Sequence, residues 1–224
     1  MDFSDLIAKR RTPRIFRVTR KLNIPDLISH VTQRAAGKEP LFVEDKDYLV
    51  MLGLLKEISQ SYSLQMYAFS LMPNHVHLLF GLTEDNLYGA MRDLFFRYVL
   101  WFNRKYERKG HLFGGPYRQS VCLDDSYLLA ASLYIHLNPV RAQLAEEPKN
   151  YHWSSCRLYT LTDPPKSFIN SQFILTMLSD DLPQARETYR VLLKEGAQIN
   201  SGEVLEEERS IRDFAFFSHQ KIGS

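Results

Sequence analysis

Two histidines separated by a single residue are the first candidates for chemistry in this chain. His75 and His77 flank Val76 within the apolar run HVHLLF, whose composition is typical of a β-strand. Residues i and i+2 of a strand project from the same face, so we expect the two imidazoles to lie side by side. Imidazole is the commonest side-chain metal ligand, and such a pair is half of a divalent-cation site. Two histidines on a solvated strand face would have the same spacing, so the pattern alone does not distinguish a metal site from such a face.

A tyrosine and an asparagine four residues apart form the second candidate pair. Tyr134 and Asn138 stand in a predicted helix just before Pro139, and positions i and i+4 of a helix share one face. A phenol oxygen can attack a phosphodiester and form a covalent phosphotyrosine, which divides one strand break into two reversible steps. A metal ion that polarises the phosphate would assist this attack. The chain contains 12 tyrosines, so a tyrosine buried in the core is the alternative interpretation.

Positive charge is concentrated at the N-terminus. Residues 1–21 carry a net charge of +5 within a chain whose total is +2, so the remainder carries −3. A basic arm on a nearly neutral body suits contacts with phosphates, which weaken as salt is added. Arg10, Arg11 and Arg14 are the candidates for such contacts, and a solvated tail is the alternative.

The predicted helix over residues 86–109 interleaves basic and aromatic side chains. Most of its aromatic residues fall at core-like spacing and are expected to be buried. Its basic C-terminal end predicts DNA contacts from Arg104, Lys105 and Arg108. The glycine-rich loop HLFGGPYR follows and contributes His111 and Arg118 as further candidates. Its two adjacent glycines permit close approach of the backbone to a ligand, and a tight connection between helix and strand would use them equally well.

The composition is that of an ordinary globular protein. Of the 224 residues, 45% are hydrophobic and 24% are charged, as in soluble domains. We find no apolar run long enough to span a membrane and no secretory signal, and we expect a cytoplasmic protein. Cys122 and Cys156 make neither a disulfide framework nor a metal motif and are expected to be packed thiols.

The predicted elements alternate in a recognisable order. A strand over 27–34, a helix from Asp45 or Asp47 to about Tyr62, and a hairpin of 64–71 and 75–82 come first. A helix over 86–109, a strand over 117–123 and a helix that Pro139 ends at Asn138 follow. The β-α-β-β-α-β order predicts an α+β, ferredoxin-like split βαβ core: an antiparallel sheet with helices on one face. Two further helices, over 168–178 and 183–195, are predicted beyond a linker at 163–165.

Four segments together carry a family resemblance. In this order and at similar spacing, LMPNHVHLLF, HLFGGPYR, YIHLNPVRAQL and YHWSS resemble the REP-associated tyrosine transposases. These are single-tyrosine members of the HUH nucleases, which cut and rejoin single-stranded DNA. The resemblance covers roughly residues 12–160, and RETYRVLLKEG is similar to a C-terminal helix of many relatives. It implies a basic arm over 1–26, a catalytic domain over 27–160 that includes the tyrosine helix, and a helical C-terminal extension over 161–224.

The resemblance implies a role for each candidate. His75 and His77 would bind Mg²⁺ or Mn²⁺, Tyr134 would be the nucleophile, and Asn138 would supply a third metal ligand. Attack on the phosphate would leave a 5′-phosphotyrosine and a free 3′-OH, without a nucleotide cofactor. The partner would be single-stranded DNA with a hairpin structure, in the nucleoid of a prokaryotic cell. Arg34 joins the expected DNA contacts, and a monomer or a homodimer is compatible with this mechanism.

The chain also departs from the family pattern. The first strand is followed by HVTQRAAGKEP rather than a glycine-rich turn, the N-terminal arm is longer and more basic than expected, and the C-terminal region has no recognisable second DNA-binding motif. Two other functions therefore stay open. One is a descendant that grips nucleic acid without cutting it. The other is an unrelated metalloenzyme that uses the histidine pair with His111 or His136.

Overall fold

The structure is a computed structural model that describes residues 16–17, 22, 24–37, 39–122 and 124–198. Arg10, Arg11 and Arg14, the predicted phosphate contacts of the N-terminal arm, lie outside these residues. Within the described ranges, no helix combines the length and the apolar character that crossing a membrane requires.

The sheet has five strands, and every neighbouring pair is antiparallel. Its order is β1-β5-β2-β4-β3, so the first long strand and the second hairpin strand occupy the centre. This order confirms the predicted α+β, split-βαβ core. The strands are β1 (Phe16–Arg17), β2 (Ile28–Arg34), β3 (Gln65–Met72), β4 (His75–Gly81) and β5 (Arg118–Cys122).

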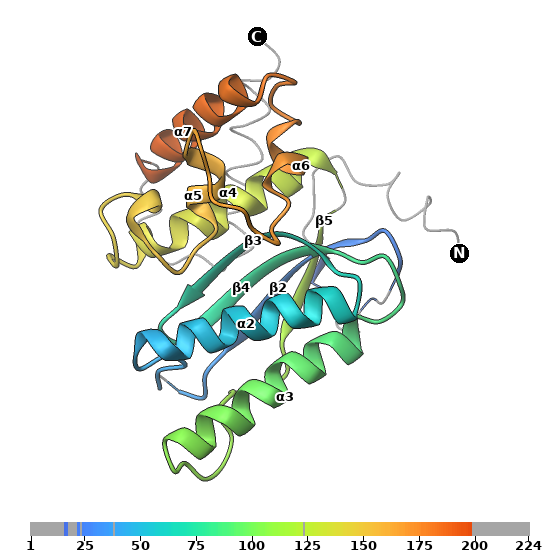
Figure 1. Ribbon diagram of the computed structural model, residues 1–224, viewed down its shortest axis with the longest axis vertical. Coiled ribbons are helices and arrows are strands. Elements are labelled where there is room, and N and C mark those ends of the chain that lie inside the picture. Colours follow the sequence, from blue (N-terminus) through green and yellow to red (C-terminus); the bar gives the residue numbers. More distant parts are fainter. Residues whose placement is uncertain (1–15, 18–21, 23, 38, 123, 199–224) are drawn as a thin grey trace.

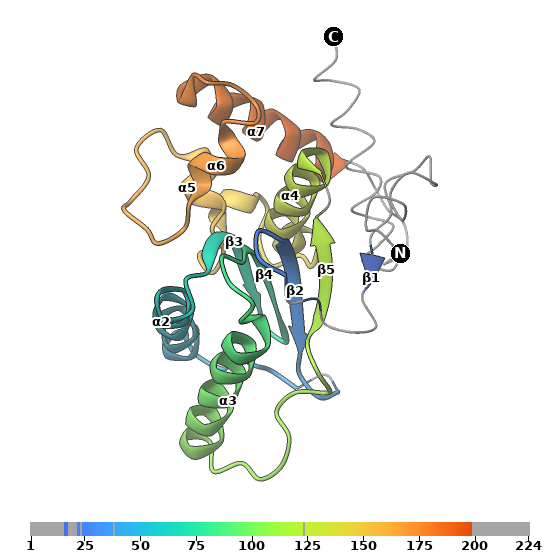
Figure 2. The ribbon, with the colours of Figure 1, turned by 90° about the vertical axis from the view of Figure 1, so that its right-hand side faces the viewer.

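Helices cover both faces of this sheet. The predicted pair, α2 (Asp45–Ser61) and α3 (Leu87–Lys105), lies on one face, as Figure 2 shows. The helix with the candidate tyrosine, α4 (Asp125–Arg141), lies across the other face and is followed by the remaining helices (Figure 1). These are η1 (Pro148–Asn150), α5 (Cys156–Thr160), α6 (Ser171–Leu175) and α7 (Leu182–Gln198).

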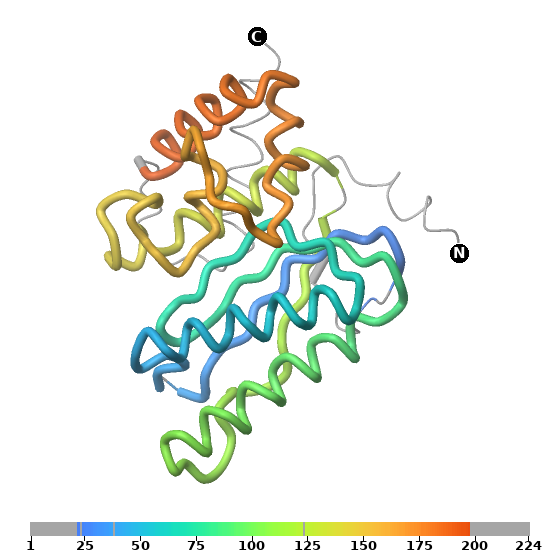
Figure 3. Tube along the Cα trace, viewed as in Figure 1, coloured from blue at the N-terminus to red at the C-terminus, as the bar shows by residue number. Residues whose placement is uncertain are grey.

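The C-terminal helices gather at one end of the molecule and enclose α4 (Figure 3). Helix α7 packs against both α4 and α5, while α4 also contacts β3. Because α4 is held between the sheet and α7, every residue from Tyr127 to Leu137 is buried. A helix enclosed in this way needs apolar side chains on all sides, which explains the long run LLAASLYIHL.

Three predicted helix ends differ from the structure. The prediction that Pro139 ends its helix at Asn138 is wrong, because α4 continues to Arg141. A proline removes one backbone donor, and this loss is tolerated in the last turn, where the N–H of Ala142 still binds the carbonyl of Asn138 at 2.9 Å. Helix α3 ends at Lys105 rather than 109, since Glu107 has a positive φ of 49° that turns the chain. The helix predicted over 168–178 is reduced to Ser171–Leu175.

The segment YHWSS covers the outer edge of the sheet. The Leu71 N–H donates to the Trp153 carbonyl at 2.8 Å, and the Ser155 N–H donates to the Phe69 carbonyl at 3.0 Å. The Trp153 ring stacks on Tyr48 of α2, with ring centroids 4.4 Å apart. This motif therefore pairs with the exposed side of β3 and ties the two helical layers together at that edge.

A buried carboxylate joins the start of α2 to the end of α3. Asp47 is fully buried and accepts the backbone N–H groups of Val43 at 2.7 Å and Glu44 at 3.1 Å. Its other contacts are the Lys105 ammonium at 2.5 Å and the Tyr106 hydroxyl at 2.8 Å. Burial alone would raise the pKa of Asp47, but these donors outweigh it and hold the pKa below its ordinary value.

Replacing Asp47 with Asn should lower the free energy of unfolding at pH 7 by about 3 kcal/mol, because one buried ion pair is broken. A carboxylate whose pKa is lowered by folding stabilises the protein above its unfolded pKa of about 3.9 and loses this effect as pH falls through the folded value. Urea denaturation at pH 7 and pH 3 should therefore show the difference shrinking in acid. Glu57→Gln, which breaks an exposed pair with Arg97, is the control and should cost less than about 1 kcal/mol. Equal losses for both variants would contradict this account.

Candidate active site

The two histidines of the HVH motif lie side by side on one face of β4, as their spacing predicts. Their ring centroids are 4.9 Å apart, and the ring planes meet at 81°. The pairing of β2 with β4 places Thr32 opposite His77 and Arg34 opposite His75. These four residues share the face that α4 covers, and His77 is completely buried there.

A third imidazole, His30 of β2, belongs to the same cluster. Its Nε2 lies 3.0 Å from Nδ1 of His77, the two rings are stacked with centroids 5.2 Å apart, and His30 is itself buried. The hydroxyl of Thr32 lies 3.4 Å from the same Nδ1. The sequence places His30, Thr32 and Arg34 on one strand face, but nothing local indicates that this face meets His77.

The hydrogen bonds of the histidine pair leave Nε2 of His77 for another ligand. Nδ1 of His75 lies 2.7 Å from Oδ1 of Asn74, an acceptor that fixes the proton on Nδ1. In the tautomer in which Nδ1 of His77 donates to Nε2 of His30, Nε2 of His77 carries a lone pair. That Nε2 is buried and has no hydrogen-bond partner among the described residues. A divalent cation would satisfy it, so the donor set fits a metal.

The electrostatic surroundings keep His77 neutral. Burial lowers the pKa of His77 well below its ordinary value, and the nearby His75, His30 and Arg34 lower it further. Only the neutral imidazole has a lone pair for a metal, so His77 is in its ligating form at neutral pH. None of the groups that act on it is acidic, and the described residues contain no cluster of three or more His, Cys, Asp or Glu side chains suited to a metal.

Tyr134 of α4 is brought against this cluster. Its ring meets His77 edge-on at 5.6 Å between centroids and meets His30 edge-on at 6.1 Å. The two candidate pairs of the sequence, which are separated by more than fifty residues, thus form one site. Asn138 is half-buried, and its amide nitrogen donates to the Tyr134 carbonyl at 2.9 Å. A metal would have to take its Oδ1, and this role as third ligand remains a prediction.

A buried polar network fixes α4 in place. His136 is fully buried; its Nδ1 lies 2.8 Å from the Tyr189 hydroxyl of α7, and its Nε2 lies 2.8 Å from Oγ of Ser155. Ser155 in turn accepts the Phe69 N–H of β3 at 2.9 Å, while the Tyr189 hydroxyl donates to Ser132 at 3.0 Å. Both ring nitrogens of His136 are therefore engaged, which argues against a metal site that uses His136.

The predicted DNA contacts fall into three groups. Arg34 and Arg118 are exposed and lie on the face of the histidine pair, with Arg118 opposite Thr32 across β2 and β5. Lys105 and Arg108 belong to the opposite layer. There Lys105 is paired with Asp47 and with Glu44, and Arg108 is paired with Glu39, so both side chains have structural partners. The remaining candidates, Arg104 and His111, are exposed.

The glycine loop after α3 packs against the backbone at the end of β2. The Gly114 N–H donates to the Arg34 carbonyl at 3.1 Å. A Cβ at Gly114 would come within 3.1 Å of the Ala35 carbonyl oxygen, so a larger residue would displace the loop. Packing against the protein backbone therefore accounts for this glycine.

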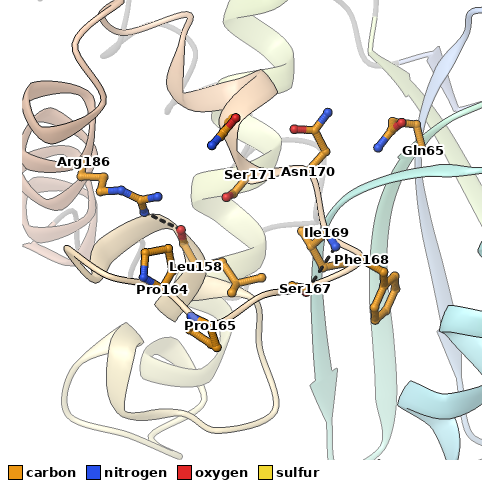
Figure 4. Close-up of a pocket in the computed structure, with 11 residues that line it drawn as sticks. Gln65, Leu158, Pro164, Pro165, Ser167, Phe168, Ile169, Asn170, Ser171 and Arg186 are labelled. Carbon is orange, nitrogen blue, oxygen red and sulfur yellow. Dashed lines mark hydrogen bonds between the residues drawn. The ribbon is translucent and has the colours of Figure 1, made fainter.

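A separate cavity lies away from these residues. It has a volume of about 420 Å³ and lies between the start of β3, the 164–172 segment and α7 (Figure 4). Arg186 lines it and donates to the Leu158 carbonyl at 2.5 Å, at the C-terminal end of α5. None of the predicted site residues takes part in this cavity.

Replacing His136 with Gln should make stability less sensitive to acid. Burial lowers the pKa of His136 to about 3, whereas an unfolded histidine titrates near 6.5. The folded form therefore loses stability as pH falls from about 6.5 towards 3. Thermal unfolding at pH 7.5 and at pH 4.5 should show a smaller shift in Tm for the variant than for the wild type. His152→Gln, at an exposed histidine, should keep the full shift; the same reduction there would contradict the assignment.

Comparison with known proteins identifies the family to which this chain belongs. The family model described as "Transposase IS200 like" matches residues 23–138, which include the histidine pair, Tyr134 and Asn138. Among solved structures, the fold is similar to that of a REP-associated tyrosine transposase bound to a REP hairpin, with a TM-score of 0.54 and 14% sequence identity. That match covers 62% of this chain and 81% of the other. No curated protein matches the chain. The family match spans more than half of the chain and agrees with the order of the elements, and the chain therefore belongs to the IS200-like transposase family.

Proposed function

We propose that this transposase cuts and rejoins single-stranded DNA with a hairpin structure, with Tyr134 as the nucleophile. The observation that carries the proposal is the edge-on packing of the Tyr134 ring against His77, at 5.6 Å between centroids. This packing brings a tyrosine to two histidines and two exposed arginines of the same sheet face, which is the combination that attack on a phosphate requires. The hairpin-bound relative supports the choice of substrate.

The proposed reaction proceeds in two reversible steps. The phenol oxygen of Tyr134 attacks the phosphorus and gives up its proton, and the bond from phosphorus to the 3′-oxygen breaks. The 3′-oxygen takes up a proton, which leaves a free 3′-OH and a 5′-phosphotyrosine. Attack by a 3′-OH on the phosphotyrosine restores the DNA strand and the phenol. No nucleotide cofactor is needed, because the covalent bond retains the energy of the phosphodiester.

His75 and His77 are proposed to hold Mg²⁺ or Mn²⁺, His77 through its Nε2 atom, with Oδ1 of Asn138 as the third ligand. When bound, the ion would polarise the phosphate as a Lewis acid. Nitrogen ligands suit Mn²⁺ better than Mg²⁺, which prefers oxygen, so we expect Mn²⁺ to support the faster cleavage.

The proposed DNA surface begins at the site and extends from it. Arg34 and Arg118 lie closest to the histidine pair, and Arg104 and His111 offer further exposed contacts. The arginines of the N-terminal arm would add salt-dependent affinity, in keeping with a protein of the prokaryotic nucleoid.

A second candidate function is a descendant that binds hairpins without cutting them. The observation in its favour is that the Asn138 amide is directed to its own helix, where its nitrogen donates to the Tyr134 carbonyl. If that side chain does not turn, the metal has only two protein ligands. A cleavage experiment with labelled hairpin oligonucleotides distinguishes the two functions.

Tyr134→Phe should abolish a covalent protein–DNA band on a denaturing gel, because only the hydroxyl is removed. The assay incubates the full chain and labelled single-stranded hairpin oligonucleotides with and without Mn²⁺. Tyr88→Phe, at an exposed tyrosine of α3, should form the band like the wild type. A band that persists in Tyr134→Phe would refute the nucleophile. Hairpin binding without a band from the wild type, over a panel of hairpin sequences, would favour the binding-only function.

His30→Ala should weaken Mn²⁺ binding by about 10- to 100-fold, because His77 loses the partner that orients its ring. Titration calorimetry with the metal alone measures this affinity without any reaction. His75→Ala should abolish detectable binding, and His152→Ala, at an exposed histidine, should leave it unchanged. An unchanged affinity in His30→Ala would show that Thr32 alone suffices to orient His77.

A further inference from the structure

Arg141 lies beside Tyr134, the proposed nucleophile. It stands in the last turn of α4, two helical turns after Tyr134, and is half-buried. Its guanidinium carbon lies 5.6 Å from the centroid of the Tyr134 ring. This placement depends on the continuation of α4 through Pro139, because a helix that ended at Asn138 would not carry Arg141 along the same side.

The end of α4 holds Arg141 in a defined position. The N–H groups of Ala142 and Gln143 bind the carbonyls of Asn138 and Val140, both at 2.9 Å. Gln143 then adopts a positive φ of 57°, which ends the helix and turns the chain away. The backbone of Arg141 is thus part of regular helix, and its side chain is the one that the last turn brings back over Tyr134.

A phosphate attacked by Tyr134 would lie close to this guanidinium. Attack by the phenol oxygen requires the phosphorus to approach within bonding distance of the Tyr134 hydroxyl, beside the ring that Arg141 contacts. The groups that act on His77 include Arg34 and no carboxylate.

We propose that Arg141 is a catalytic residue that binds the two non-bridging oxygens of the phosphate attacked by Tyr134. A guanidinium presents two parallel N–H groups that match these oxygens, and it counters the negative charge that builds up as the phenol attacks. The same pair stabilises the phosphotyrosine after the 3′-oxygen has left. This role rests on the proposed function of Tyr134.

A purely structural role is the competing explanation. A cation in the last turn of a helix interacts favourably with the helix dipole. Lysine at position 141 would keep that interaction but could not pair with two phosphate oxygens at once, because its ammonium is a point charge. The two roles therefore separate in Arg141→Lys.

The test measures the single-turnover rate of covalent adduct formation on a labelled hairpin oligonucleotide that the wild type cleaves. The rate is measured at saturating DNA with Mn²⁺. The Kd for the hairpin and the Tm of each variant are measured beside it. We expect Arg141→Lys to slow adduct formation by about 10-fold and Arg141→Gln by about 100-fold or more, with Kd within about fivefold of the wild type. Arg157→Gln, at an exposed arginine of α5, should keep the wild-type rate. Added guanidinium ion should partly restore the rate of Arg141→Ala, whereas urea at the same concentration should not.

The possible results distinguish the catalytic role of Arg141 from its alternatives. Wild-type rates in both Arg141→Lys and Arg141→Gln would overturn the role of Arg141 and leave the proposed function intact. A Lys variant as fast as the wild type beside a slow Gln variant would overturn the two-oxygen pairing. A Kd that weakens as much as the rate, without rescue by guanidinium, would make Arg141 an ordinary DNA contact. Failure of the wild type to form an adduct with any hairpin would overturn the proposed function and, with it, this role.

Discussion

The pairing register of β2 with β4 is the constraint on which the whole site depends. It sets Thr32 opposite His77 and Arg34 opposite His75, and it brings His30 within 3.0 Å of His77. Because side chains alternate along a strand, a slip by one residue would turn the histidine pair towards α2 and α3, away from Tyr134. The apolar residues on the other face of β4, among them Leu78 and Phe80, are fully buried and oppose such a slip. The packing of the core therefore also selects the face on which the chemistry takes place.

The second requirement is that α4 keeps a fixed position along its own axis on this face of the sheet. Apolar burial on all sides holds the helix between the sheet and α7 but does not by itself select one position along its axis. The hydrogen bonds of His136 with Ser155 and Tyr189 are directional and provide that selection. Ser155 belongs to the segment that covers the edge of β3. The C-terminal helices are thus structural parts of the site, although none of their side chains contacts Tyr134 in the hydrogen-bond and ring contacts of the described residues.

The site combines the neutral imidazole of His77 with cationic side chains, and this balance suits an anionic polymer. Burial keeps His77 in its neutral form, and Arg34 and Arg141 approach the cluster from the sheet and from α4. The proposed metal would retain most of its charge, because no carboxylate of the described residues acts on His77. A bound phosphate would neutralise that charge. In the proposed function, the affinities for metal and for DNA are therefore expected to support each other.

The sequence by itself determined the features that depend on local periodicity. The shared face of His75 and His77 follows from their spacing, the order of strands and helices follows from the apolar patterns, and the resemblance to tyrosine transposases follows from four short motifs. Tertiary structure alone decided that His30, forty-seven residues before His77, completes the cluster. It also engaged Lys105 and Arg108 in ion pairs and carried α4 beyond Pro139 to place Arg141 beside Tyr134. The physical reason is that strand register and helix packing depend on contacts between distant segments, which no local spacing encodes.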